Sequence, residues 1–340
     1  MGKYATLTEL AKSLGVSIST VSRALQDHPR ISQKTKDRVW HLVEESGFIP
    51  NQYAQILKDN KTYLIGVIVP DLNLHFFTRI LSAINEVIKD SKYSIVLGHS
   101  EESLEMELSL IDKFIGLRVD GVIAALSRES KDVSHFEKLT KQAIPMVFYD
   151  RVANFLIAGR IISDDYKGAF KATEYLIRTG CKTIVHITAS RNLNNSNNRM
   201  YGYLDALNDN NIAVNEELIF YFEFNHSTIQ TFLDKVLKKY PVIDGIFVFN
   251  DYVANTAIHH LLTKGVKIPD QISVIGFSNE PISDYMTPRL STVEDVAETM
   301  GQEAAQLLLQ SLESGKMPSE KIVLDQKLVL KDTTRTLAQE

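Results

Sequence analysis

From residue 63 onward, apolar runs of strand length alternate with amphipathic segments of helical length, and this alternation constrains the fold more than any other feature. Strands that alternate with helices form parallel, doubly wound sheets, in which helices cover both faces. The runs that fit a strand span 64–70, 94–100, 121–126, 145–150, 183–188, 218–224, 245–250 and 272–278. The pattern predicts an α/β protein.

These runs are too many for one comfortable sheet, and they fall into two similar series of four with a break near 160–165. This organisation predicts two α/β lobes of like design with a cleft between them. We expect the first lobe to comprise about 63–162 plus 292–322, and the second about 163–291 plus 323–340.

The first 48 residues carry three short helical patterns instead, as in a compact DNA-binding domain. Thr6 and Glu9 form a T-x-x-E capping box at the start of the first helix, and Gly15 ends that helix. The third helix begins near Ser32 and ends at Gly47.

The second helix lies in the stretch GVSISTVSRAL at 15–25, which combines hydroxyl-bearing residues with a thin apolar stripe. Ser17 is a natural N-cap. Ile18, Val21 and Leu25 are spaced to face a small core. Serine and threonine are mediocre residues in a helix interior, so their abundance here calls for a functional reason.

A hinge is expected at 49–62, between the helical head and the lobes. Pro50 stops the preceding helix, and Asn51 can cap a short helix that runs to about Leu57. Such a helix is too short to be stable alone, so we expect it to form only when something packs against it.

Charge is distributed unevenly along the chain. Residues 1–60 carry eight Lys or Arg against six Asp or Glu, whereas the whole chain has a net charge of −5. The resulting net charge of plus 2 for residues 1–60 is by itself weak evidence for nucleic-acid binding. Cys181 is the only cysteine, and neither a membrane-spanning run nor a signal pattern occurs, so a cytoplasmic location is expected.

The usual enzyme signatures are missing from the sequence. No G-x-G-x-x-G follows the first strand, and no P-loop, G-x-S-x-G or H-E-x-x-H motif occurs. His259 and His260 are adjacent on an expected helix, where side chains diverge by about 100° and do not readily share a metal ion. We therefore expect a binding protein without cofactor, metal or catalytic residues.

Several stretches, in order along nearly the whole chain, resemble the lactose-repressor/galactose-repressor family of bacterial transcription regulators. The head carries TLTELAKSLGVSISTVSRAL and ISQKTKDRV, followed by the hinge motif GFIPNQYAQIL. The lobes carry IGVIVPD, VDGVIAA, VFYDR, the R-x-x-G of 199–202, FVFND and ISVIGFSNEPISDYMTPRLSTV. The resemblance implies a helix-turn-helix head, a hinge helix and a two-lobed core like that of periplasmic sugar-binding proteins.

The same resemblance assigns DNA contacts. Ile18, Ser19 and Arg23 match base-reading positions, with Arg23 suited to guanine in the major groove. Leu57 matches the leucine that opens a base step in the minor groove. The remaining DNA-binding positions match phosphate contacts at Thr6, Ser17, Thr20, Ser22, Ser32 and Thr35, and hinge contacts at Asn51, Ala54 and Gln55.

An effector is expected in the cleft, at the carboxyl ends of the strands. For Arg199 and Asp251, a structural role as an interlobe ion pair or a helix cap is the alternative. The expected effector-binding residues are His75, Phe76, Asp150, Arg151, Arg199, Asn250, Asp251 and Ser278.

Ser278 departs from the family, which usually has a sugar-binding aspartate there. Serine removes a charge and a bidentate acceptor, whereas Arg151 and Arg199 keep two guanidiniums in the cleft. We therefore hypothesise that the effector is a sugar acid or a sugar phosphate.

The implied mechanism is a population shift in a homodimer bound to a pseudo-palindromic operator. The chain lacks the leucine-repeat tail of family tetramers, which favours a dimer. Two alternatives stay open, a sugar-binding sensor without DNA function and a sugar-modifying enzyme with a DNA-binding head. Arg23 and Leu57 argue against the first, and the missing catalytic motifs argue against the second.

Overall fold

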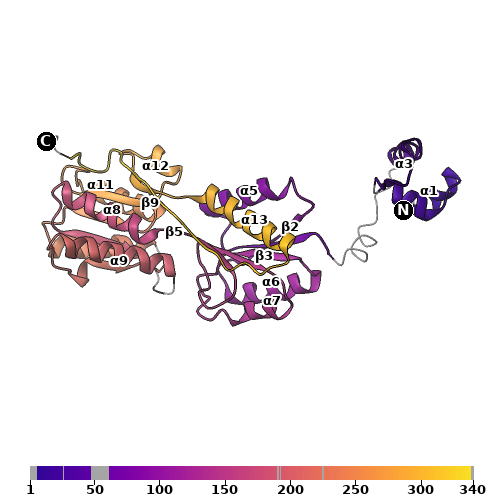
Figure 1. Cartoon of the computed structure of the whole chain (residues 1–340). Coiled ribbons are helices and arrows are strands. Elements are labelled where there is room, and N and C mark those ends of the chain that lie inside the picture. Colours follow the sequence, from indigo (N-terminus) through magenta and orange to yellow (C-terminus); the bar gives the residue numbers. More distant parts are fainter. Residues whose placement is uncertain are drawn as a thin grey trace. The chain divides into compact units, whose positions relative to one another are not determined.

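The computed structural model describes residues 6–25, 27–46, 61–189, 191, 193–223 and 226–337. The chain divides into two compact units, Met1–Thr62 and Tyr63–Glu340 (Figure 1). The expected hinge contacts Asn51, Ala54, Gln55 and Leu57 lie outside the described residues.

The first unit is a three-helix head with α1 (Leu7–Leu14), α2 (Ile18–Leu25) and α3 (Gln33–Ser46). The expected capping box is present, because the Thr6 hydroxyl accepts the Glu9 N–H and the Glu9 carboxylate accepts the Thr6 N–H. Gly15 ends α1 in the left-handed conformation, at φ 66°, which glycine adopts without steric cost.

The core of the head is small, and it corrects one sequence prediction. Its buried members are Leu10, Ala11, Val21, Ala24, Val39 and Val43. Ile18 was expected to face this core, but its side chain is 48% exposed. Ala24 is fully buried instead. Val21 and Ala24 are three residues apart, so they lie on the same face of α2, and this face packs on the core.

The second unit holds two six-stranded sheets, each of which defines one lobe (Figure 1). The order in lobe 1 is β11-β5-β4-β3-β1-β2, and the order in lobe 2 is β12-β10-β9-β8-β6-β7. Among the strands that the structure describes, every pair is parallel except β10 with β12. The strands of lobe 1 are β1 (Leu64–Val69), β2 (Ser94–His99), β3 (Gly121–Ala124), β4 (Met146–Tyr149), β5 (Gly159–Ser163) and β11 (Lys321–Leu324). Those of lobe 2 are β6 (Ile184–Thr188), β7 (Ile219–Tyr221), β8 (Gly245–Val248), β9 (Ser273–Ser278), β10 (Ser291–Glu294) and β12 (Leu328–Val329).

All eight expected strands are present, while β5, β10, β11 and β12 were not expected. Two expected lobe boundaries differ from the structure. Residues 292–294 were assigned to lobe 1, but β10 pairs with β9 in lobe 2. Residues 323–324 were assigned to lobe 2, but β11 pairs with β5 in lobe 1. The chain thus passes between the lobes at 163–165, 294–297 and 324–328.

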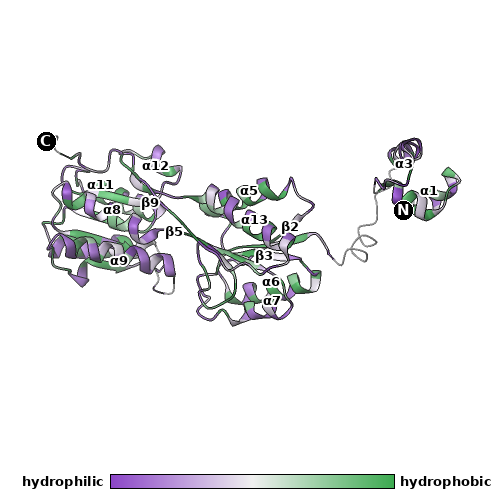
Figure 2. Cartoon of the chain, viewed as in Figure 1, coloured by the Kyte–Doolittle hydropathy of each residue, from purple (hydrophilic) through white to green (hydrophobic). Residues whose placement is uncertain are grey.

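Helices cover both faces of each sheet, which explains the nearly continuous apolar strands (Figure 2). In lobe 1, α5 (His75–Ile88) and α13 (Ala297–Ser314) cover one face, and α6 (Leu104–Leu117), η1 (Ser134–Phe136) and α7 (Glu137–Lys141) cover the other. In lobe 2, α10 (His226–Lys239) and α11 (Asp251–Thr263) lie opposite α8 (Asp165–Arg178) and α9 (Asn194–Asp209). The short elements η2 (Glu216–Leu218) and α12 (Ile282–Tyr285) complete lobe 2. Within the described ranges, no helix combines the length and hydropathy needed to span a bilayer.

Candidate effector site and DNA-binding surface

A cavity of about 190 Å³ lies between the lobes, and this interlobe cavity is lined by residues that follow strands of both sheets. Asp71 and Asp150 follow β1 and β4, whereas Asn250 and Glu280 follow β8 and β9. Because all these strands are parallel within their sheets, their carboxyl ends bring the loop residues together at one edge.

Six of the eight expected effector residues line the interlobe cavity, and two do not. The lining ones are Phe76, Asp150, Arg151, Arg199, Asn250 and Ser278. The side chain of Asp251 is buried behind the cavity wall, and His75 contacts a lining residue from outside.

Arg151 and Arg199, two of the three arginines that line the interlobe cavity, are already paired. The Arg151 Nη1 atom lies 2.7 Å from a carboxylate oxygen of Glu102, and both side chains are at least nine-tenths buried. Arg199 donates from Nε and Nη2 to the same oxygen of Asp165, at 2.8 and 2.7 Å. Burial raises the pKa of Asp165 to about 6, although Arg199 acts to lower it. The guanidiniums that motivated an anionic effector therefore carry their own counter-charges.

Arg199 is also fixed by packing. Its guanidinium lies 3.7 Å from the centre of the Phe277 ring, and Nη1 donates to the Phe249 carbonyl at 2.5 Å. Gly202, at the end of the R-x-x-G motif, allows α9 to approach α8, since a Cβ there would lie 2.3 Å from the Tyr166 carbonyl oxygen. This close approach brings Arg199 on α9 to Asp165 at the start of α8.

Three non-glycine residues that line the cavity adopt positive φ values, namely Glu102 at 58° and two residues at the ends of strands. Asp150 follows β4 with φ 54°, and Ser278 ends β9 with φ 105°. Such conformations cost about 1–3 kcal/mol each and cluster at ligand sites. Burial raises the pKa of the Asp150 carboxyl, which lies 3.7 Å from Arg151 and 3.4 Å from the amide nitrogen of Asn195.

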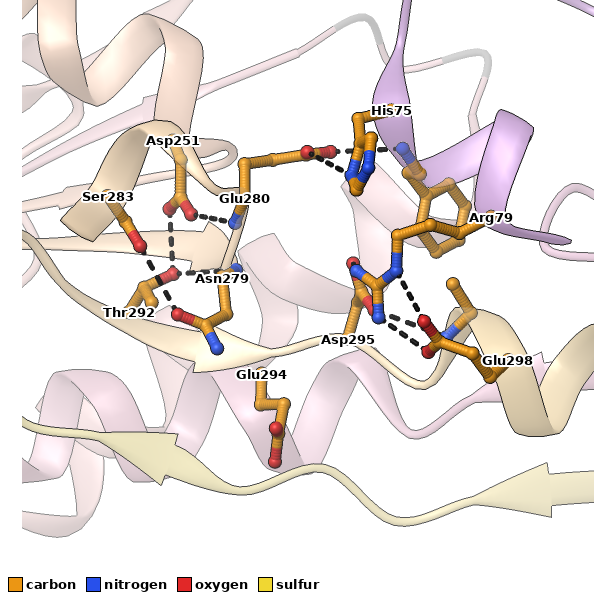
Figure 3. Close-up of polar contacts among 12 residues, drawn as sticks. His75, Arg79, Asp251, Asn279, Glu280, Ser283, Thr292, Glu294, Asp295 and Glu298 are labelled. Atoms are coloured by element: carbon orange, nitrogen blue, oxygen red, sulfur yellow. Dashed lines mark hydrogen bonds and ion pairs between the residues drawn. The ribbon is translucent and has the colours of Figure 1, made fainter. Parts of the chain in front are cut away.

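Asp251 stabilises the loop after β9 instead of facing the cavity. It accepts hydrogen bonds from the Glu280 N–H and the Thr292 hydroxyl, both at 2.7 Å (Figure 3). Gly276 makes room for it, since a Cβ there would lie 2.2 Å from an Asp251 oxygen. Burial raises the pKa of Asp251 to about 7. Its neighbour Asn250 caps α11 by accepting the Val253 N–H at 2.8 Å.

Glu280 links the lobes, and sequence reasoning missed it. Its Oε1 atom accepts the Phe76 N–H in the first turn of α5 at 3.2 Å, and its Oε2 atom lies 3.4 Å from Nδ1 of His75 (Figure 3). A carboxylate at a helix N-terminus is stabilised by the exposed N–H groups there. Glu280 therefore joins the loop after β9 in lobe 2 to α5 in lobe 1.

Arg79, one turn further along α5, contacts two more carboxylates. Its Nη1 atom lies 3.0 Å from Asp295, and its Nε and Nη2 atoms lie 2.7 and 2.5 Å from Glu298 (Figure 3). Burial raises the pKa of Asp295 to about 6. Glu280 and Asp295 both line the interlobe cavity, and we call them its acidic wall.

The remaining lining residues that sequence reasoning missed are mostly aromatic or polar loop residues. Most follow strand ends, and that position alone was the available signal. They include Phe77, Phe222, Phe249, Tyr252 and Phe277 among the aromatics, and Asp71, Glu102, Arg128, Asn195 and Gln326 among the polar residues. No cluster of three or more metal-ligating side chains occurs in the described part of the chain.

In the head, hydroxyl groups gather at the start of α2. Ser17 Oγ accepts the Thr20 N–H at 3.1 Å and lies 2.8 Å from the hydroxyls of Ser19 and Thr20. Ile18, Ser19 and Arg23 are exposed on the same helix. The expected base-reading side chains are therefore accessible from solvent.

The starts of the other helices of the head repeat this arrangement. Thr6 caps α1, and Ser32 accepts the Thr35 N–H at 3.3 Å ahead of α3. Thr6 and Ser32 are exposed, while Thr35 and Ser22 are half-buried. Short donors at helix N-termini suit phosphate contacts.

Comparison with known proteins identifies the family. Residues 6–51 match the bacterial regulatory proteins of the lacI family, and residues 173–334 match a periplasmic binding protein-like domain. The chain is 31% identical over 335 residues to the HTH-type transcriptional regulator MalR of Clostridium butyricum, covering 96% of this chain and 98% of that protein. The chain belongs to the lacI family of bacterial regulatory proteins.

Solved structures of the lacI family share its architecture. The lac repressor dimer bound to operator and the anti-inducer ONPF matches with a TM-score of 0.87 at 25% identity, covering 98% of this chain and all of that one. A periplasmic binding protein/LacI transcriptional regulator from Alkaliphilus metalliredigens, complexed with D-xylulofuranose, matches with a TM-score of 0.69 at 26% identity. That match covers 81% of this chain and all of the other.

Proposed function

We propose that this lacI-family regulator is a repressor whose affinity for operator DNA is set by a small carbohydrate in the interlobe cavity. One observation carries the proposal, namely a cavity whose charged lining comes from both lobes. A ligand there contacts both lobes at once and favours one lobe arrangement over another. The cavity is smaller than the ~300–1,000 Å³ typical of drug-sized ligands, so a monosaccharide fits it better than an oligosaccharide.

The proposal includes the assembly and location of the protein. The chain acts as a cytoplasmic homodimer on a pseudo-palindromic site, in keeping with the lac repressor dimer bound to operator. It is not an enzyme, since relatives such as MalR are transcriptional regulators. Nothing in the cavity calls for a cofactor.

Glu280 supplies the step from ligand to lobe arrangement. It lines the cavity and accepts the Phe76 N–H of α5, so a ligand that moves this carboxylate also changes a contact between the lobes. The effector shifts the population of lobe arrangements by its difference in affinity for them.

The experiment is footprinting of the full chain on its own upstream DNA, followed by titration with neutral sugars, sugar acids, sugar phosphates and amino sugars. Arg23→Ala should weaken operator binding by ~1–3 kcal/mol and relax base preference at one position of each half-site. Arg178→Ala, an exposed arginine on α8, is the matched control. Equal binding by wild type and Arg23→Ala, or occupancy that no carbohydrate changes, would contradict the proposal.

A further inference from the structure

Charge in the interlobe cavity is unbalanced. Among lining residues, five carboxylates face three guanidiniums. Arg151 and Arg199 bring partners of their own, Glu102 and Asp165, so they leave little positive charge for the rest of the cavity. The carboxylates that line it are Asp71, Glu102, Asp150, Glu280 and Asp295, and the guanidiniums belong to Arg128, Arg151 and Arg199.

The surplus is concentrated at the acidic wall. Arg79 is shared between Asp295 and Glu298, so one guanidinium serves two carboxylates. Glu280 is held by the backbone N–H of Phe76 and lies beside the half-exposed His75. Hydrogen bonds from N–H groups orient these carboxylates without supplying a full counter-charge.

Glu280 also has an unused acceptor. Its side chain is 3% exposed, and among the described residues no hydrogen bond reaches its Oε2 atom. Nδ1 of His75 lies 3.4 Å from Oε2, close enough for an ion pair when the ring is protonated but outside the geometry of a hydrogen bond. A buried carboxylate oxygen that has an ion-pair neighbour but no hydrogen bond gains from a donor that a ligand supplies.

Burial is the main influence on the titration of the acidic wall. Burial raises the pKa of Glu280, and it raises the pKa of Asp295 to about 6. Glu280 acts to raise the pKa of both Asp251 and Asp295, whereas Arg79 acts to lower that of Asp295.

We propose that the effector is an amino sugar, whose protonated amino group donates hydrogen bonds to the Glu280 carboxylate at the acidic wall. The inference rests on the proposed function and names the ligand class of the same site. An ammonium group supplies both a hydrogen-bond donor for the Glu280 carboxylate and positive charge for the acidic wall. A neutral hydroxyl supplies only the donor. The rings of Phe76, Phe222 and Phe249 give the apolar face of a sugar ring a surface to pack on. A metal ion is a poorer candidate, because the described residues contain no cluster of ligands for one.

The test compares matched ligands on the full chain by isothermal titration calorimetry and thermal shift. The probes are glucosamine, galactosamine and mannosamine, each beside its neutral parent sugar and its N-acetyl derivative, with ethanolamine as an amine that lacks the ring. We expect at least one amino sugar to bind about tenfold or more tightly than its parent and its N-acetyl form.

Glu280→Gln should abolish that preference while keeping the shape of the wall. Glu294→Gln, a change of the same kind at a residue that does not line the cavity, should keep it. Asp295→Asn is a second variant, in case loss of the Glu280 contact to α5 prevents folding. It should weaken the preference more than Glu294→Gln does.

Three results would overturn the inference. They are a neutral sugar that binds as tightly as its amine, a preference for the amine that survives Glu280→Gln, and failure of all three amino sugars to bind at millimolar concentration. In each of them the proposed function stands if another carbohydrate changes operator occupancy. Binding of ethanolamine alone would also contradict the sugar assignment.

Discussion

The paired arginines and the acidic wall are two kinds of buried charge in one cavity. Arg151 and Arg199 have carboxylate partners within 2.8 Å, so the chain itself neutralises them. The negative charge of Glu280 and Asp295 is only partly offset by nearby positive charge. Their position depends on N–H donors and on Arg79. The first arrangement is complete without a ligand, whereas the second gains from a cation.

The difference shows which buried charges give stability and which give binding. An ion pair that the chain completes resists removal of either partner, since the other is left buried and uncompensated. A carboxylate without a full counter-charge is costly in the empty protein, and a ligand that supplies the charge recovers that cost as affinity.

The largest effect is expected from breaking a completed pair. Asp165→Ala leaves the buried Arg199 guanidinium without its carboxylate and should lower the free energy of unfolding by about 3–5 kcal/mol. Urea denaturation followed by circular dichroism measures the loss. Asp325→Ala removes the exposed partner of Lys167 and should change stability little. Similar losses in the two variants would contradict the distinction.

Asp251, which accepts the Glu280 N–H, should respond to pH in the opposite sense to a salt-bridged carboxylate. The pKa of Asp251 is raised to about 7 in the folded protein, above its unfolded value of about 4. The folded state therefore holds the proton more tightly, so this contribution to stability is full below about pH 4 and is lost as pH rises through 7. A shift of this size corresponds to about 4 kcal/mol at most.

Asp251→Asn tests this pH dependence, because asparagine keeps the shape and does not ionise. The variant should lose less stability than wild type between pH 5 and pH 8, in denaturation series at fixed salt. Asp284→Asn, at an exposed carboxylate on α12, should keep the wild-type slope. Parallel slopes for wild type and Asp251→Asn would mean that Asp251 is ionised throughout this range.

More of the fold than of the site could be predicted from the sequence. Buried parallel strands read as apolar runs, so eight of the twelve described strands were visible. The others are short or polar. In β10, the buried Ser291 bonds to Thr333 and Thr334 instead of packing as an apolar side chain. The lobe boundary at 292 was wrong for that reason.

The site was predictable where a residue stands in a motif at a strand end, as Asp150 and Asn250 do. Glu280 also stands in a quoted motif, ISVIGFSNEPISDYMTPRLSTV, just after β9, but its role depends on α5, 204 positions away in the sequence. Arg199 and Ser278 were placed in the cavity from the resemblance, and an ion pair was the alternative for Arg199, but its partner Asp165 was not predicted. Charge balance in a cavity depends on which side chains meet in space, and a motif does not record that.

The smallest effect is expected from introducing at position 278 the aspartate that the family resemblance leads us to expect there. Ser278→Asp adds a negative charge to a cavity that already has a surplus, and should lower the stability of the ligand-free protein by about 1 kcal/mol at pH 8. Ser278→Asn introduces a side chain of the same size as aspartate but without the charge, so it controls for the effect of a larger side chain at the strained φ of 105°. The difference between the two variants should shrink at pH 5, where carboxyls with a raised pKa are protonated. A Ser278→Asp variant more stable than Ser278→Asn at pH 8 would show that this end of the cavity has unused positive charge, and an anionic effector would then regain its physical basis.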